Sequence, residues 1–128
     1  MKPREYKYIT KVYCGISVVT CCDTHYHSDC ALSLSSALQS ASALARSGTV
    51  VLNMSTVRLF SSSALRAVRA AHVAVQNSDG QIVAAGGGEL VLNVLKFAPF
   101  IHHSESVYDA LARLSQEAAT AYAKAEGA

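Results

Sequence analysis

A short apolar run, three consecutive serines and an amphipathic stretch follow one another in this chain and constrain its fold more than any other feature. Residues 50–54, VVLNM, are too few for a helix and suit a strand that is buried on both faces. The hydroxyls of Ser61, Ser62 and Ser63 can cap the backbone N–H groups of a helix N-terminus. Apolar side chains then recur every three or four residues, which predicts a helix from Ser63 to about Gln76.

The chain before this stretch predicts two further strands and a helix. Residues 7–20 are rich in apolar side chains and are interrupted near Cys14 and Gly15, which predicts two strands joined by a tight turn. Residues 21–29 are polar and predict a loop. Ser28 or Asp29 can cap a helix that Gly48 ends. The apolar face of that helix is expected to comprise Leu34, Leu38, Ala41 and Ala45.

The chain after Gln76 continues the alternation of strands and helices. Residues 81–85 predict a buried strand, and three glycines precede a helix whose buried face is expected to include Leu90, Val91, Val94 and Leu95. Phe100 and Ile101 suit an edge strand, and Ser104 can cap a last helix. We expect the alanine-rich tail after about residue 116 to be frayed. This order predicts a single α/β domain over residues 1–128, with a four- to five-stranded, mostly parallel or mixed sheet and about four helices.

Composition narrows the classes of function. The chain has 128 residues, of which 51% are hydrophobic and only 16% charged, so part of its apolar surface is expected to meet a partner. The formal charge of +2 comes from scattered basic residues, which disfavours nucleic-acid binding. No apolar run approaches the roughly 20 residues of a membrane helix. We expect a cytoplasmic protein with reduced cysteines, no cofactor and no membrane partner.

Two segments carry a resemblance to a known family. TVVLNMSTVRLFSSSALRAV is similar to the signature of the STAS domain, and within it of the bacterial anti-sigma factor antagonists, roughly V-x-D-L-S-x-V-x-F-x-D-S-S-G-L. DGQIVAAGGGELVLNVLKFAPFIHHSESVYDALARL is similar to the closing elements of the same domain. The residues in register within the first segment are Val51, Met54, Ser55, Val57, Phe60, Ser62, Ser63 and Leu65. The resemblance is continuous over residues 49–114 and agrees with the predicted STAS-type fold.

The resemblance also implies a function. Proteins of this family are not enzymes; they bind an anti-sigma factor, a serine protein kinase that uses ATP, and so release a sigma factor for transcription, for example in a stress response. It implies a phosphoprotein whose modified residue is Ser63, with Ser62 as the second candidate. The partner-binding residues that it implies are Asp23, Ser61, Ser62, Ser63, Arg66 and Arg69. A homo-oligomer stays open as an alternative.

Three residues depart from the family pattern. Asn53 and Ser61 stand where the family usually has aspartates, and Ala64 replaces a glycine. The carboxylate normally beside the modified hydroxyl is therefore missing. If the serines had no regulatory role, helix capping alone would account for them.

A second interpretation of the function rests on the cysteines and histidines of residues 21–30. Cys22, His25, His27 and Cys30 imitate the spacing of metal ligands, although only Tyr26 separates the two halves. The alternative interpretation is a polar loop between cysteines that are buried as small hydrophobic residues. Two other functions are thus kept open: a redox- or metal-responsive STAS sensor that uses the Cys21–Cys30 loop, and a STAS scaffold subunit that does not act on a sigma factor.

Overall fold

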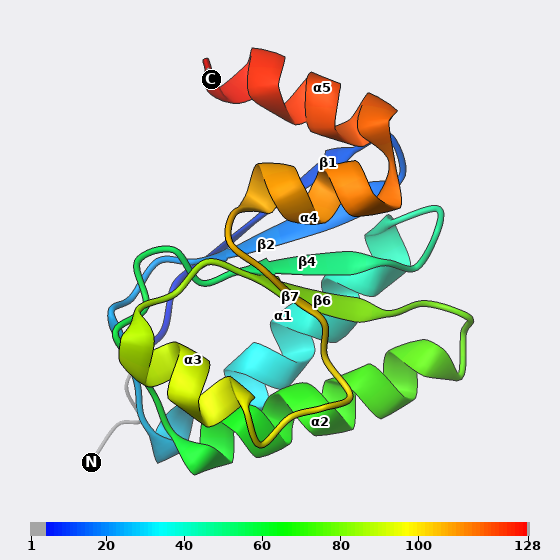
Figure 1. The fold of residues 1–128 in the computed structure, drawn as a ribbon. Helices are drawn as coiled ribbons and strands as arrows, with labels where there is room; N and C mark the ends of the chain where they lie inside the picture. The colour runs from blue at the N-terminus through cyan, green and yellow to red at the C-terminus, as the bar shows by residue number, and fades with distance from the viewer. Residues whose placement is uncertain (1–4, 128) are drawn as a thin grey trace.

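The computed structural model describes residues 5–127, and its main sheet has five strands in the order β1-β2-β4-β6-β7 (Figure 1). These strands are β1 (Tyr8–Tyr13), β2 (Ile16–Cys21), β4 (Val50–Asn53), β6 (Ile82–Ala85) and β7 (His103–Ser104). β1 pairs with β2 in antiparallel fashion, and all other neighbours in this sheet are parallel. The predicted α/β fold with a mixed sheet is therefore confirmed.

Helices cover both faces of the main sheet (Figure 1). α1 (Ala31–Leu44) and α2 (Ser62–Gln76) lie side by side on one face, with α3 (Glu89–Leu95) at the end where α2 begins. α4 (Val107–Leu114) and α5 (Gln116–Glu126) lie on the other face. None of the helices within residues 5–127 combines the length and the apolarity that crossing a membrane requires.

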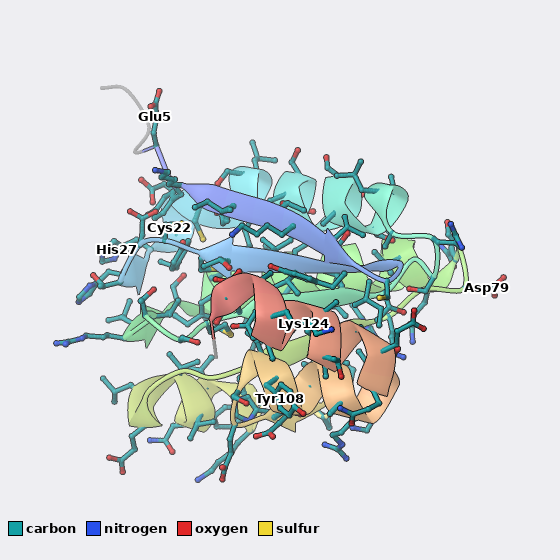
Figure 2. The ribbon with its side chains drawn as sticks, turned by 90° about the horizontal axis from the view of Figure 1, so that it is seen from above. Glu5, Cys22, His27, Asp79, Tyr108 and Lys124 are labelled. Atoms are coloured by element: carbon teal, nitrogen blue, oxygen red, sulfur yellow. The ribbon has the colours of Figure 1, made fainter. Side chains whose placement is uncertain are left out.

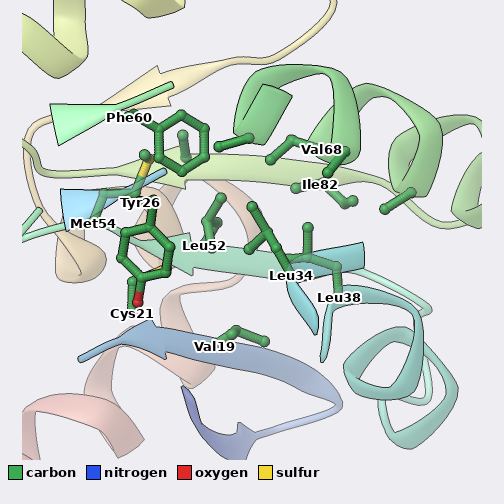
Figure 3. Close-up of a cluster of buried hydrophobic side chains, with 14 of the residues drawn as sticks. Val19, Cys21, Tyr26, Leu34, Leu38, Leu52, Met54, Phe60, Val68 and Ile82 are labelled. Atoms are coloured by element: carbon green, nitrogen blue, oxygen red, sulfur yellow. The ribbon is translucent and has the colours of Figure 1, made fainter. Parts of the chain in front are cut away.

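The alternation of side chains along each central strand supplies a core on both faces of the sheet. On the α1 and α2 side, Val19, Leu52 and Ile82 meet Leu34 and Val68 (Figure 3). On the α4 and α5 side, the core is built from Val18, Val51, Val83, Val107 and Leu111. β4 is buried along residues 50–52, as its continuous apolar run predicted.

Residues 21–29 do not form the simple loop that the sequence predicted. They contain β3 (His25–Tyr26), which pairs in parallel with β5 (Leu59–Phe60) to form a second, two-stranded sheet. A 3-10 helix over Ser28–Cys30 leads directly into α1, so neither Ser28 nor Asp29 caps that helix as expected. Two-residue strands are too short to show a period in the sequence.

The expected edge strand and helix cap are each displaced along the chain. The edge strand is β7 at residues 103–104, not Phe100–Ile101, because Ile101 turns inward and is buried. Ser106 rather than Ser104 caps α4, with its hydroxyl accepting a hydrogen bond of 3.0 Å from the backbone N–H of Asp109. His103 is half-buried, and its Nε2 lies 2.7 Å from the carbonyl oxygen of Gly86.

The end of the chain forms a fifth helix, one more than the predicted number of about four, where the sequence predicted a frayed tail. Ser115 adopts an extended conformation that ends α4, and its hydroxyl accepts a hydrogen bond of 3.2 Å from the N–H of Ala118 in α5. Ala118 and Ala119 are buried. Tyr122 meets Tyr13 of β1 edge to face, with 5.4 Å between the ring centroids. The small alanine side chains let α5 lie close to the sheet, which offsets the entropy of ordering the tail.

Candidate functional site

The serine turn, Ser61 to Ser63, begins α2, and its first residue is the helix cap. The Ser61 side chain accepts a hydrogen bond of 3.1 Å from the N–H of Ala64, while the Ser61 N–H donates one of 2.9 Å to the carbonyl of Tyr26. α2 therefore begins at Ser62 and not at Ser63 as the sequence predicted. The hydroxyl of Ser61 is committed to the fold, which leaves the next two hydroxyls for chemistry.

Ser62 and Ser63 occupy the first two positions of α2 and differ in exposure. The Ser62 side chain is exposed, whereas Ser63 is half-buried and its Oγ lies 3.4 Å from the guanidinium of Arg66, a long hydrogen bond. Backbone N–H groups of the first helical turn point toward this end, where the helix dipole favours negative charge. A phosphate on either hydroxyl would be stabilised by that dipole and by Arg66.

Arg66 and Arg69 lie on the exposed side of α2, directly behind the serine turn. Together with Ser62 and three apolar side chains they line a shallow hollow of about 310 Å³. The apolar members are Leu65, Phe97 and Phe100. The guanidinium of Arg69 lies 6.0 Å from the centroid of the Phe100 ring, at the outer limit of a cation–π contact. The structure thus brings three sequence-predicted residues, Ser62, Arg66 and Arg69, onto one surface, and the hydroxyl of Ser63 lies next to Arg66.

Asp23 lies in the loop that precedes β3, and its carboxylate has a structural partner. Its Oδ2 accepts a hydrogen bond of 2.8 Å from the N–H of Lys7, and its own N–H donates one of 3.2 Å to the Tyr26 hydroxyl. Asp23 therefore helps to hold the N-terminal segment against this loop. The side chain stays partly exposed, so a contact with a partner remains compatible with its position.

The second sheet joins the Asp23 loop to the serine turn. Tyr26 on β3 is fully buried, and its ring centroid lies 5.1 Å from that of Tyr6 and 6.1 Å from that of Phe60 on β5. Burial raises the pKa of the Tyr26 hydroxyl, with Cys21 adding to the shift. Sequence reasoning missed Tyr26 as a support of the site, although a lone aromatic side chain among polar residues is a signal of burial.

An apolar groove lies between β5 and α3, on the other side of the serine turn. It measures about 410 Å³. Its lining consists of Leu59, Phe60, Ser61, Leu90, Asn93, Val94 and Phe97. Leu90 was expected to be buried but is 63% exposed, and Phe97 is 82% exposed. The short α3 turns only Val91 fully inward. Val94 and Leu95 are half-buried against the core, whereas Leu90 and Leu92 face solvent.

The candidate metal ligands of residues 22–30 do not converge. Cys30 is buried in the core, whereas Cys22 is exposed and its thiol donates to the carbonyl of Thr20 at 3.6 Å. His25 and His27 stack with ring centroids 6.0 Å apart, and the Nδ1 atom of His25 lies 2.8 Å from the Thr24 hydroxyl. Within residues 5–127, no group of three or more His, Cys, Asp or Glu side chains is placed to hold a metal ion.

The two buried cysteine thiols, Cys21 and Cys30, also lack an activating environment in this structure. Burial raises the pKa of Cys21 to about 12 and also raises the pKa of Cys30. A thiol must be deprotonated to act as a nucleophile or metal ligand. Cys22 and His27 lie at one end of the molecule and Asp79 at the opposite end (Figure 2). The geometry does not favour the redox- or metal-responsive alternative.

The fold and the serine turn define a class: an α/β domain with a mixed sheet, helices on both faces and an anion-favouring helix N-terminus at one edge. Solved structures of this class are similar to the chain. An anti-sigma-factor antagonist (STAS) domain protein from Planctomyces limnophilus has a TM-score of 0.73 at 12% identity, covering 84% of this chain and 97% of that one. An anti-sigma factor antagonist from Mycobacterium paratuberculosis has a TM-score of 0.70 at 19% identity, covering 88% and 96%.

A third similar structure is the Bacillus cell fate determinant SpoIIAA in its phosphorylated form. Its TM-score is 0.62 at 13% identity, and the match covers 87% of this chain and all of that one, 100%. No protein-family model and no curated protein matches the sequence. The chain therefore has the STAS fold, as its sequence predicted.

Proposed function

We propose that this protein is an anti-sigma factor antagonist: it binds an anti-sigma factor of the serine-kinase type in the cytoplasm and so releases a sigma factor for transcription. The observation that carries the proposal is the serine turn, where exposed Ser62 and half-buried Ser63 lie beside Arg66 at the start of α2. Solved antagonists share the fold. The role is binding, so the proposal assigns no catalytic residue and no cofactor to the chain.

Phosphorylation of the serine turn is the proposed switch. A phosphate adds about 1.5 to 2 negative charges and three strong acceptor oxygens to a surface that a partner must desolvate. The dipole of α2 and the guanidinium of Arg66 stabilise the phosphate on the free protein. Binding of the partner would then require burial of that charge or its removal from Arg66. Phosphorylation therefore favours the unbound state.

Two departures from the family pattern preserve the acceptor atoms that aspartates would supply. The Ser61 hydroxyl caps α2, a role that an aspartate side chain fills at the same position. The Oδ1 atom of Asn53 accepts a hydrogen bond of 3.1 Å from the N–H of Ser55, and its amide donates to the Thr20 hydroxyl at 3.2 Å. The local backbone geometry is thus held without either carboxylate, while the negative charge is lost.

The experiment that tests the proposal is affinity capture from the native cell, with identification of the captured protein and mapping of phosphate on the chain. Ser63→Asp and Ser62→Asp are compared with Ser63→Ala and Ser62→Ala. Ser78→Asp is the matched control, because Ser78 is exposed just beyond the other end of α2. We expect an anti-sigma factor to be captured by the parent, by both alanine variants and by Ser78→Asp.

Capture should fall with the aspartate at whichever serine is modified, so the variant pairs also separate Ser63 from Ser62. Two results would contradict the proposal. One is capture of no anti-sigma factor by any variant. The other is equal capture by all variants with no phosphate on either serine, which would remove the switch and leave the binding role.

A further inference from the structure

Large exposed apolar side chains gather beside the serine turn. Leu90 is 63% exposed, Phe97 is 82% exposed and Leu59 is 36% exposed, and all three line the apolar groove between β5 and α3. Phe97 also lines the hollow that contains Ser62, Arg66 and Arg69. The groove and the hollow are therefore neighbours that share one aromatic side chain. An exposed apolar patch of this kind, rimmed by polar residues, marks a protein interaction surface.

The charged residues around this surface are mostly basic. Arg66 and Arg69 line the hollow, and the exposed Arg58 and Lys96 are adjacent in sequence to the groove residues Leu59 and Phe97. Glu89, adjacent in sequence to Leu90, is also exposed, so the four cations outnumber one carboxylate. The charge on this face thus favours an acidic partner, since complementary potentials steer association and oppose binding of like-charged surfaces.

The same charges argue against a second copy of this chain as the occupant. A two-fold interface through the groove would place the same patch on both sides, so the cations around Phe97 would meet their own copies. Like charges brought together in an interface oppose binding. The groove is also open and shallow, which suits the face of a helix better than an enclosed small molecule.

We propose that the groove and the hollow together seat an amphipathic, acidic helix of the partner, with its apolar face on Phe97 and Leu90 and its carboxylates on Arg66 and Arg69. This inference rests on the proposed function and deepens it by describing the partner. It also gives the switch a second cause. A phosphate on Ser62 or Ser63 would compete with the partner's carboxylates for Arg66 and would repel them.

The test uses photo-cross-linking from two positions of the full chain in the native cell. Phe97→p-benzoylphenylalanine probes the groove. Leu44→p-benzoylphenylalanine is the matched control, because Leu44 is also a large exposed apolar residue, 65% exposed, at the far end of α1. We expect position 97 alone to cross-link to the anti-sigma factor, within a segment whose sequence is amphipathic and acidic. Cross-linking to a second copy of this chain, to a basic or extended segment, or to nothing would overturn the inference.

The affinity of this chain for the partner identified by cross-linking then measures the contribution of each side chain to binding. Phe97→Ala should weaken that affinity roughly tenfold or more, whereas Leu44→Ala should leave it unchanged. The double variant Arg66→Gln, Arg69→Gln should weaken binding and flatten its salt dependence. If the groove captures an acidic helix of a protein that is not an anti-sigma factor, the proposed function fails and this inference stands. If the anti-sigma factor binds Phe97→Ala and Leu44→Ala equally well, this inference fails alone.

Discussion

The hydroxyl of Tyr13 donates a hydrogen bond of 2.9 Å to the carboxylate of Glu126 and so ties the edge strand β1 to the last turn of α5. The ammonium of Lys11 lies 3.3 Å from the same carboxylate oxygen. These contacts hold a helix that the sequence alone did not predict. They join residues more than a hundred positions apart, which no local pattern can indicate.

The anchoring of α5 should depend on pH. The hydrogen bonds from Tyr13 and Lys11 lower the pKa of Glu126 from its ordinary value of 4.5. A lowered folded pKa stabilises the protein above the ordinary value, and that contribution is lost as the pH falls through the folded pKa. We expect Glu126→Gln to lower the thermal midpoint at neutral pH and to make its decline toward about pH 3 shallower. Glu117→Gln, in the first turn of α5, is the control; identical pH profiles for both variants would refute the anchoring role.

The stability of the fold should show a second pH dependence, at higher pH, because of His72. Its ring is buried against the sheet, and its Nδ1 accepts a hydrogen bond of 3.3 Å from the N–H of Ile82. Burial lowers the pKa of His72 below its ordinary value of 6.5, so the folded state favours the neutral ring. The unfolded chain then binds more protons just below pH 6.5, and stability falls as the pH drops through that window.

The variant His72→Leu should lower the free energy of unfolding at neutral pH, because it leaves the Ile82 N–H without its acceptor. It should also remove much of the decline between about pH 7.5 and about pH 5.5. Urea unfolding at both pH values measures this. His102→Leu, at an exposed histidine, is expected to keep the decline of the parent; a decline that persists in His72→Leu would assign it to other groups.

Gly80 and Gly88 differ in the space around them, so alanine substitutions at these two positions test how tightly each is packed. A Cβ added at Gly80 would lie 2.3 Å from the carbonyl oxygen of Gly48 and 2.7 Å from a methyl of Val75. A Cβ at Gly88 would meet no atom within 4 Å. Gly80→Ala should therefore destabilise the fold by about 1–3 kcal/mol or more, and Gly88→Ala by about 0.5 kcal/mol. Equal unfolding free energies for the two variants would show that the turn after α2 yields more easily than its contacts suggest.

The sequence predicted those parts of the fold that leave a clear pattern of apolar residues. The continuous apolar run at 50–54 and the helical spacing from Leu65 to Val75 are two such patterns, and the strand and the helix lie where the patterns placed them. The sequence did not predict β3 and β5, because a strand of two residues has no period. The sequence also showed no sign of the break at Ser115, since Leu114 and Ala118 keep helical spacing although the backbone at Ser115 is extended.

The candidate site, like the fold, was predicted from the sequence only in part. Serines before an amphipathic run predicted a capped helix start, and the structure identifies Ser61 as the cap. The exposure of Leu90 on α3 and of Phe97 just beyond it could not be predicted. In so short a segment the sequence does not distinguish an apolar residue that faces the core from one that faces a partner. Only the position of α3 against β5 decides which side is outward.

The last prediction concerns Ser61, where the sequence departs from the family carboxylate. Ser61→Ala removes the acceptor for the Ala64 N–H and should lower the free energy of unfolding by about 1 kcal/mol. Ser61→Asp keeps an acceptor at the same place and adds a negative charge at the positive end of α2, worth about 0.3–1 kcal/mol at low salt. We therefore expect Ser61→Asp to be at least as stable as the parent, with a gain that shrinks as salt is added.

Urea unfolding at low and high salt measures this order, and Ser62→Ala serves as the control because its exposed hydroxyl does not cap the helix. If the proposed kinase recognises the family carboxylate, the added aspartate should also raise phosphorylation of Ser62 or Ser63. The two readouts are independent, since the cap acts on the fold and the carboxylate acts on the kinase. A stability of Ser61→Ala equal to that of Ser62→Ala would mean that another group caps α2, whatever the result for phosphorylation.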